Sequence, residues 1–252
     1  MRSGTHHLLI LLFLAAGVPV LHASTWEDAN AAFSASDFTK AAPLYQGTID
    51  REGFTAARLF NLGNAYAKLN QTGSAVLCYE RAALLAPRDA DIRANLKFIR
   101  SANTAMLEPA PPLWKAPLYW LSLHEWSWMA AVGLVILTAA ILTKIFPVSR
   151  PVCLQRAAMP LLASGLALAL PGGLALQQRG AETQLAILTT SGPVLRLSPF
   201  PTADPVDASP PLPGQRVIPG ERHGSWVHLS LPGSSTTGWV PEQDIALIIP
   251  AS

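Results

Sequence analysis

Few residues of this sequence are of a type and spacing that could do chemistry. His223 and His228 stand five residues apart, as metal ligands can, but nothing around them completes a metal site. Cys78 and Cys153 are the two cysteines, and neither belongs to a CxxC pair. The chain also contains no HExxH, no GxSxG and no phosphate-binding glycine loop. We therefore expect no catalytic residue, no metal and no cofactor, and the residues that could bind a partner become the main question.

A repeat organises the residues that could bind. Matching side chains recur at intervals of 34 residues, as Ala41 and Ala75, Tyr45 and Tyr79, and Trp26 and Phe60. A 34-residue period with Leu-Gly-x-x-Tyr, then Ala-x-x-x-aromatic and then proline is typical of tetratricopeptide repeats, in which pairs of antiparallel helices stack. The second copy carries this signature at Leu62, Gly63, Tyr66, Ala75, Tyr79 and Pro87. The sequence therefore predicts a tetratricopeptide repeat domain over residues 24–108.

Gly63 is unfavourable in a helix, because glycine there costs about 1 kcal/mol relative to alanine. We expect packing to offset this cost. Gly63 and Ala75 should lie where the two helix backbones approach, with Tyr66 and Tyr79 beside them. Pro87 should end the second helix, because proline lacks the amide hydrogen and clashes with the preceding turn.

The first copy is degenerate, with Ala29 in place of the glycine. A further helix from Asp89 to about Asn103 should begin at an aspartate cap and cover the last apolar face of the stack. Two copies are fewer than the three that usually make a stable stack, so we expect capping or membrane contacts to help.

Six positions resemble those that line the concave face of tetratricopeptide repeats: Trp26, Asn30, Phe33, Phe60, Asn64 and Lys68. Asn30 and Asn64 occupy the same place in the two copies, and asparagines there can clamp the backbone or the terminal carboxylate of a bound peptide. The clamp is incomplete, because Ala94 and Phe98 stand where its later basic residues would be. The alternative is that the aromatic residues belong to the core and the asparagines face water.

Two apolar blocks are long enough to cross a membrane. Residues 126–143 and 157–176 carry no charged side chain, and neither shows the polar stripe of a helix on a soluble protein. We expect transmembrane helices over 126–146 and 157–176. Residues 109–125 then form an interfacial linker rich in proline and tryptophan, because tryptophan rings prefer the headgroup layer. The tryptophans of this region are Trp114, Trp120, Trp126 and Trp128.

Residues 1–23 have the layout of a secretory signal peptide, with a basic residue, an apolar core and a small residue at the end. An uncleaved anchor is the alternative. The loop 147–156 and its flank hold Lys144, Arg150 and Arg156 and no acidic residue, so this loop should be cytoplasmic and both flanking segments exported. Cys78, expected as a small buried residue, would then be separated from Cys153 by the membrane and could not pair with it.

Residues 177–252 differ from the rest of the chain in their sequence pattern. Short β-type runs alternate with Gly, Pro and Ser turns, namely AILTT, PVLRLSP, QRVIPG, SWVHLSL, TGWVP and IALII. Five or six strands in so short a segment predict a small barrel. The runs VLRLSP, GSWVxL and GWVP resemble a bacterial SH3-like domain, although the loop PTADPVDASPPLPG is longer than usual. Trp226 and Trp239 are either barrel core or ligand contacts.

The order of these parts resembles the BatE-type proteins of the bacterial aerotolerance operon, and the best segment is RLFNLGNAYAKLNQTGSAVLCYERAALLAPRDADIRANLKFIR. The resemblance implies a multidomain α plus all-β membrane protein, anchored in the bacterial inner (cytoplasmic) membrane with both soluble domains on the periplasmic side. It also implies an envelope scaffold that works with membrane-anchored von Willebrand factor A-type proteins and a MoxR-type ATPase.

Two hypotheses for function follow. The first is an adaptor without enzymatic activity that binds partner proteins through its tetratricopeptide repeats in an aerotolerance or stress-related complex. The second is a protein that binds peptidoglycan, or senses the cell wall, through the SH3-like domain. A formal net charge of +2 gives no reason to expect a nucleic-acid partner.

Overall fold

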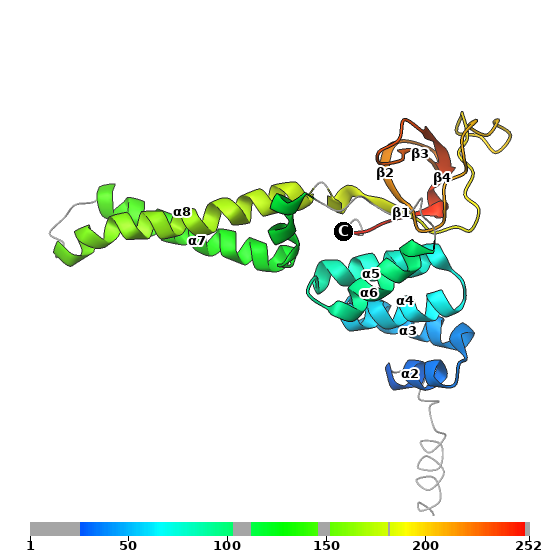
Figure 1. The fold of residues 1–252 in the computed structure, drawn as a ribbon, viewed down its shortest axis with the longest axis horizontal. Helices are drawn as coiled ribbons and strands as arrows, with labels where there is room; N and C mark the ends of the chain where they lie inside the picture. The colour runs from blue at the N-terminus through cyan, green and yellow to red at the C-terminus, as the bar shows by residue number, and fades with distance from the viewer. Residues whose placement is uncertain (1–25, 103–111, 146–151, 181, 250–252) are drawn as a thin grey trace, which may run out of the picture.

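The computed structural model of the protein describes residues 26–102, 112–145, 152–180 and 182–249. Three parts are visible in Figure 1: a group of short helices, a long two-helix hairpin and a small sheet. The predicted signal peptide lies outside the described residues, as do parts of the predicted linker and of the loop between the two spans.

Residues 26–101 form five α-helices: α2 (Trp26–Ser34), α3 (Phe38–Glu52), α4 (Ala56–Lys68), α5 (Thr72–Leu85) and α6 (Ala90–Ser101). Each packs against the next along the chain. Side chains of Asp37, Thr55 and Asp89 accept hydrogen bonds from amides in the first turns of α3, α4 and α6. The helix predicted after Asp89 is confirmed, and α5 ends at Leu85, shortly before Pro87.

The 34-residue period is repeated in the backbone of the turns that join α2 to α3 and α4 to α5. Ser36 and Asn70, 34 residues apart, are both in the left-handed region, with φ of 60° and 58°. Asp37 N donates to Ala32 O at 2.9 Å, and Gln71 N donates to the Tyr66 carbonyl at 2.9 Å. Both turns therefore reverse the chain with one shared geometry.

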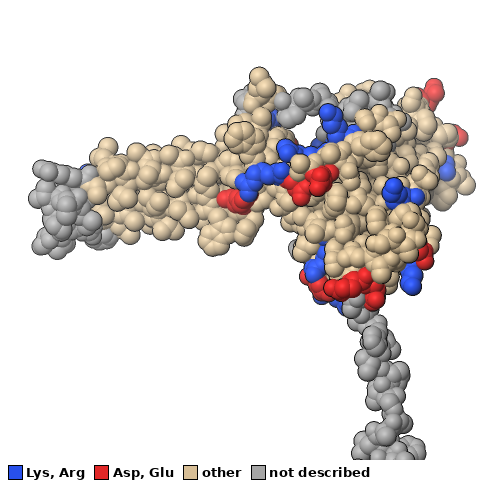
Figure 2. Space-filling view, turned by 60° about the horizontal axis from the view of Figure 1, so that its bottom comes forward, with Lys and Arg blue, Asp and Glu red and all other residues tan. Residues whose placement is uncertain are grey.

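The hairpin consists of α7 (Leu123–Ile145) and α8 (Val152–Gly180), which pack side by side (Figure 1). The segments Leu123–Ile145 and Ala157–Gly180 are long and apolar enough to span a membrane, with mean hydropathy of 2.0 and 1.7. Large side chains such as Val135 and Leu170 point outward, and the face seen in Figure 2 lacks charged residues along most of the hairpin. So large an exposed apolar surface is typical of a protein that contacts lipid.

Small residues let the two helices approach. A Cβ on Gly133 of α7 would lie 2.5 Å from the backbone nitrogen of Ala169 in α8. The helices also extend beyond the predicted spans, because α7 begins at Leu123 and α8 runs from Val152 to Gly180.

Residues 182–249 form an antiparallel sheet of five strands: β1 (Ala186–Leu188), β2 (Arg216–His223), β3 (Trp226–Ser230), β4 (Thr237–Pro241) and β5 (Ile245–Leu247). Its order is β4-β3-β2-β1-β5. The sixth predicted run, VLRLSP, forms no strand but two isolated bridges, from Arg196 to Trp239 at the outer edge of β4 and from Arg196 to Pro205. Within these residues β4 and β5 remain the two edges of an open sheet, so the predicted closed barrel is not formed.

Helix α5 packs against this sheet as well as against its helical neighbours (Figure 1). Gly73 lies so close to the end of β1 that a Cβ would be 2.5 Å from the carbonyl oxygen of Leu188. Side chains of both parts then form one buried cluster, consisting of Ala75, Val76, Leu77, Tyr79, Leu96, Ile187 and Ile248. The helical part and the sheet, which the sequence analysis treats as separate domains, therefore share a core.

Charged side chains complete this contact. Glu80 of α5 is only 5% exposed and lies between two arginines. Arg216 of β2 donates to both of its oxygens, from Nη2 to Oε2 at 2.8 Å and from Nε to Oε1 at 3.1 Å, and Arg100 of α6 pairs with Oε1. Arg81 adds hydrogen bonds to the carbonyl oxygens of Leu247 (2.9 Å) and Ile248 (3.0 Å).

We expect Glu80→Gln to lower the free energy of unfolding by about 3 kcal/mol, because removing one partner of a buried ion pair leaves the other charge uncompensated. The matched control is Glu52→Gln, which breaks an exposed pair with Arg58 and should change stability by less than about 1 kcal/mol. Urea unfolding of the full-length protein in detergent measures both changes. Equal midpoints for the two variants would contradict the structural role given to Glu80.

Candidate binding site on the helical face

Asn30 joins three consecutive helices. Its side-chain oxygen Oδ1 accepts a hydrogen bond from the hydroxyl of Tyr45 in α3 at 2.7 Å. The same oxygen accepts from Nδ2 of Asn61 in α4 at 3.5 Å. The amide of Asn30 thus contributes to the packing of α2 on α3 and α4.

Asn64 repeats this arrangement one period later. Its Oδ1 accepts from the hydroxyl of Tyr79 in α5 at 2.8 Å and from Nδ2 of Asn95 in α6 at 2.8 Å. A hydrogen bond between side chains stabilises a fold by about 0.5–1.5 kcal/mol, and by more when its loss would leave a buried group unpaired. The second cluster is therefore a structural contact between α4, α5 and α6.

These two clusters give the asparagines a role that neither interpretation of the sequence included. Their carbonyl oxygens are used inside the protein, so those atoms neither clamp a ligand nor simply face water. The sequence did contain a signal: the dipeptide Asn-Leu at 61–62 recurs at 95–96, at the same spacing as the two tyrosines. A polar residue repeated with the core positions indicates a repeated internal hydrogen bond.

The aromatic candidates pack around the same tyrosines. Trp26 and Phe33 lie against Tyr45, with ring centroids 5.2 Å and 6.4 Å away. Phe60 lies against Tyr79 at 6.0 Å. All three candidates are partly buried against the helical core. This agrees with the alternative interpretation of the sequence, in which the aromatic residues belong to the core.

A cavity of about 530 Å³ opens on the helical part, lined by residues of α2, α4, α5 and α6 and of the turn between α4 and α5. It is lined by Phe33, Asn64, Ala67, Lys68, Asn70, Thr72, Tyr79, Asn95, Phe98 and Ile99. Three of the six predicted groove residues are therefore brought together here, while Trp26, Asn30 and Phe60 are not among the lining residues. Helix α6 provides a further wall, in which Phe98, at a position where the clamp would carry a basic residue, is 78% exposed.

The predicted packing residues lie in the core beneath this cavity. A Cβ on Gly63 would lie 2.8 Å from Cε1 of Tyr79 and 3.2 Å from Cβ of Cys78, so the glycine makes room for the tyrosine ring. Tyr66 is partly buried in the same helical core. Ala75 is fully buried, but it faces the cluster shared with the sheet.

Burial changes the acidity of two groups in α5. It raises the pKa of the Cys78 thiol to about 12, with a small opposing effect of Arg81. It also raises the pKa of Tyr79 to about 12, while the amide of Asn95 acts in the opposite direction. Both groups keep their protons at neutral pH, so Tyr79 acts as a hydrogen-bond donor and Cys78 as an apolar side chain.

The histidines, which could bind a metal, do not lie together with other metal-binding side chains. His228 lies on β3 with its ring 5.2 Å from that of Trp239, and His223 lies at the end of β2. Within the part of the chain that the structure describes, no three His, Cys, Asp or Glu side chains gather as metal ligands.

Comparison of the chain with protein-family models, with curated proteins and with solved structures yields no match. The function must therefore be argued from the residues of this chain.

We expect the protein to lose stability as the pH rises above about 8.5, the usual pKa of a cysteine thiol. A proton that the folded state holds more tightly stabilises the fold fully below the unfolded pKa, and that contribution is lost as the pH rises through the folded value. The stabilising contribution of Cys78 should decrease from about pH 8.5, and that of Tyr79 from about pH 10. For each group the free energy of unfolding should fall by about 1 kcal/mol per pH unit, up to about pH 12.

Unfolding midpoints in urea between pH 7.5 and 11 test this expectation in a Cys153→Ser background. Adding Cys78→Ala as a control should remove the loss of stability that begins near pH 8.5 and leave the loss that begins near pH 10. The thiol of Cys78 should also resist alkylation at pH 8.5 until urea is added, because the thiolate is the reactive species. Rapid labelling of the folded protein would show that this site is open to water.

Proposed function

We propose that the protein is a membrane-anchored adaptor that binds partner proteins in the cavity on its helical face. The observation that carries the proposal is the composition of this cavity. The cavity is lined by an exposed aromatic residue, Phe98, and by a lysine, Lys68, together with side chains that carry amide and hydroxyl groups. Such a mixture of apolar side chains with several polar groups suits an extended peptide segment.

The tetratricopeptide interpretation supports this proposal. The period of 34 residues is found in the side chains, in the turn backbones at Ser36 and Asn70, and in the two asparagine–tyrosine clusters. Stacked helical hairpins of this kind expose a continuous face that is suited to binding other proteins. On this interpretation the C-terminal strands belong to an SH3-like domain, and their sheet packs against α5.

The partners are proposed from the resemblance to BatE-type proteins. They are membrane-anchored von Willebrand factor A-type proteins and, across the membrane, a MoxR-type ATPase, in a complex related to aerotolerance. An adaptor fixed to the membrane meets such partners at a raised local concentration, which compensates for a modest affinity of a single cavity.

Testing the adaptor requires residues that bind without holding the helices together. Asn30 and Asn64 are unsuitable because their substitution would break internal hydrogen bonds. Lys68→Gln with Phe98→Ser changes two exposed side chains and should weaken partner binding by roughly 2 kcal/mol, or about 30-fold. Crosslinking and recovery of partners from membranes measures the loss.

The matched control is Lys97→Gln with Phe200→Ser, which also removes one lysine and one exposed phenylalanine, the latter from the sheet part. It should leave partner recovery unchanged. Retention on purified peptidoglycan is measured in parallel for both variants. If the control variant alone loses wall retention and the cavity variant recovers all partners, the wall-binding hypothesis replaces the adaptor.

We further propose that the loop 147–156 is cytoplasmic and that the helical part and the sheet are exported, since the excess of basic residues lies in that loop. In a Cys153→Ser background, Ser36→Cys and Ser234→Cys should react with an impermeant thiol reagent in spheroplasts, and Ser149→Cys should react only after lysis. Cys78 is buried and should not contribute. If Ser149→Cys alone is labelled in spheroplasts, the orientation is the reverse of the one proposed.

A further inference from the structure

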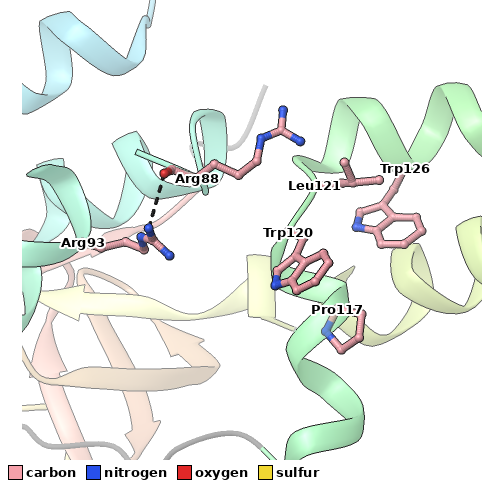
Figure 3. Close-up of a pocket in the computed structure, with 6 residues that line it drawn as sticks. All are labelled: Arg88, Arg93, Pro117, Trp120, Leu121 and Trp126. Carbon is pink, nitrogen blue, oxygen red and sulfur yellow. Dashed lines mark hydrogen bonds between the residues drawn. The ribbon is translucent and has the colours of Figure 1, made fainter. Parts of the chain in front are cut away.

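A second cavity, of about 470 Å³, lies where the helical part meets the beginning of the hairpin (Figure 3). It is lined by Arg88, Arg93, Pro117, Trp120, Leu121 and Trp126. One wall comes from the α5–α6 turn and the start of α6. The other comes from the 3₁₀ helix η2 (Leu113–Tyr119), the turn after it and the first residues of α7.

The first wall is cationic. In Figure 3, Arg88 extends towards the second wall, whereas the guanidinium group of Arg93 lies close to the first wall, beside the carbonyl oxygen of Arg88. Arg93 donates from Nε to Asp89 O at 3.2 Å and from Nη2 to Arg88 O at 3.4 Å, so main-chain oxygens orient it. Arg88 donates from Nη2 to Oε1 of Glu125 at 2.6 Å.

Glu125 reduces the positive charge of this wall but does not cancel it. Its other oxygen, Oε2, accepts from the backbone amide of Ser122 at 2.7 Å, so both of its oxygens are engaged in holding the start of α7. An arginine has five N–H donors in a planar fork, and the contacts above use few of them. The remaining donors of Arg88 and Arg93 suit a group with several oxygens and negative charge.

The second wall is aromatic, and hydrogen bonds to its backbone hold it in place. Nε1 of Trp126 donates to the carbonyl oxygen of Leu118 at 3.0 Å. Arg179, buried in the last turn of α8, donates from Nη1 to the carbonyl oxygen of Leu121 at 2.6 Å. The turn between η2 and α7 is thereby held in place, and Trp120, which projects from it, is 69% exposed.

The position of the cavity indicates its ligand. It adjoins the end of α7 at which the apolar surface of the hairpin begins. In a bilayer spanned by α7 and α8, this end reaches the headgroup layer, where tryptophan side chains accumulate and where lipid phosphates lie. Arginines facing an aromatic wall at that depth match a phosphate attached to an apolar tail.

We propose that this cavity binds the phosphate of an anionic phospholipid from the adjacent leaflet. The phosphate lies between Arg88 and Arg93, and the glycerol and first methylene groups lie against Trp120 and Leu121. The site goes beyond the proposed adaptor function, and its occupation fixes the height and tilt of the helical part above the membrane. A soluble phosphate shares the recognised group but lacks the tail.

The test uses the full-length protein in a neutral detergent. Native mass spectrometry measures retention of added phosphatidylglycerol, with phosphatidylcholine as the comparison lipid. We expect preferential retention of phosphatidylglycerol and a loss of about tenfold or more in Arg88→Gln with Arg93→Gln. Arg93→Gln alone, which removes no ion pair recorded in the structure, should give a smaller loss.

The matched control is Arg58→Gln with Arg222→Gln, which removes two charges and breaks two exposed ion pairs elsewhere. It should retain phosphatidylglycerol as the unchanged protein does. Equal retention by all variants overturns the site, and displacement of the lipid by an equal concentration of inorganic phosphate overturns its lipid nature. Partner recovery with the same variants should be unchanged, so failure here is distinguishable from failure of the adaptor.

Discussion

Helix α5 is buried on nearly all sides, and the rest of the soluble part depends on this burial. One face packs on α4 and α6 and carries Tyr79 into its asparagine cluster. Another face meets β1 through Gly73, where the backbones approach too closely for any larger residue. Glu80 then joins α6 and β2 through two arginines. A helix enclosed in this way cannot shift without disturbing both the helical face and the sheet.

This enclosure links the candidate binding site to the sheet. Tyr79 lines the cavity on the helical face, and the next residue in the chain is the carboxylate that holds Arg216. The two asparagine clusters fix the spacing of the helices that form the cavity walls. The sheet therefore acts as the support of α5, and the helical part has a wall on its second side that a two-copy stack would otherwise lack.

The sequence predicted what depends on local or periodic signals. The start of α6 followed from the capping residue Asp89, the two spans from uninterrupted apolar runs, and most strands from short β-type runs. It did not predict the open sheet, because closure depends on pairing between distant strands, and VLRLSP contributes only isolated bridges at Arg196. The shared core was missed although the apolar residues of α5 are not confined to one face, which is typical of a helix buried on several sides.

The candidate cavity was predicted in part for the same reason. Lys68 and Asn64 followed from repeat position, whereas Asn95 and Phe98 recur at the same period in α6 but were not assigned to the groove, because neither is a basic residue of the clamp. Asn30 was assigned to the groove because its position repeats, yet its oxygen is directed to Tyr45. Repeat position alone thus fixes which helix face a residue lies on, and the partner of a polar group on that face is decided by neighbouring helices.

The connection to the hairpin is as constrained as the soluble part. The chain enters α7 through η2 and leaves α8 through η3 (Glu182–Gln184), and the hydroxyl of Tyr119 donates to Glu182 across these two segments. Arg179 adds a second link to the carbonyl oxygen of Leu121, and its guanidinium lies 5.4 Å from the ring centre of Tyr119. Since entry and exit are tied to each other, the start of α7 and the end of α8 are held together where the hairpin meets the soluble part. In the proposed adaptor, such a fixed junction would limit how far the cavity can move relative to the hairpin, so geometry would contribute to selectivity alongside the side chains of the cavity.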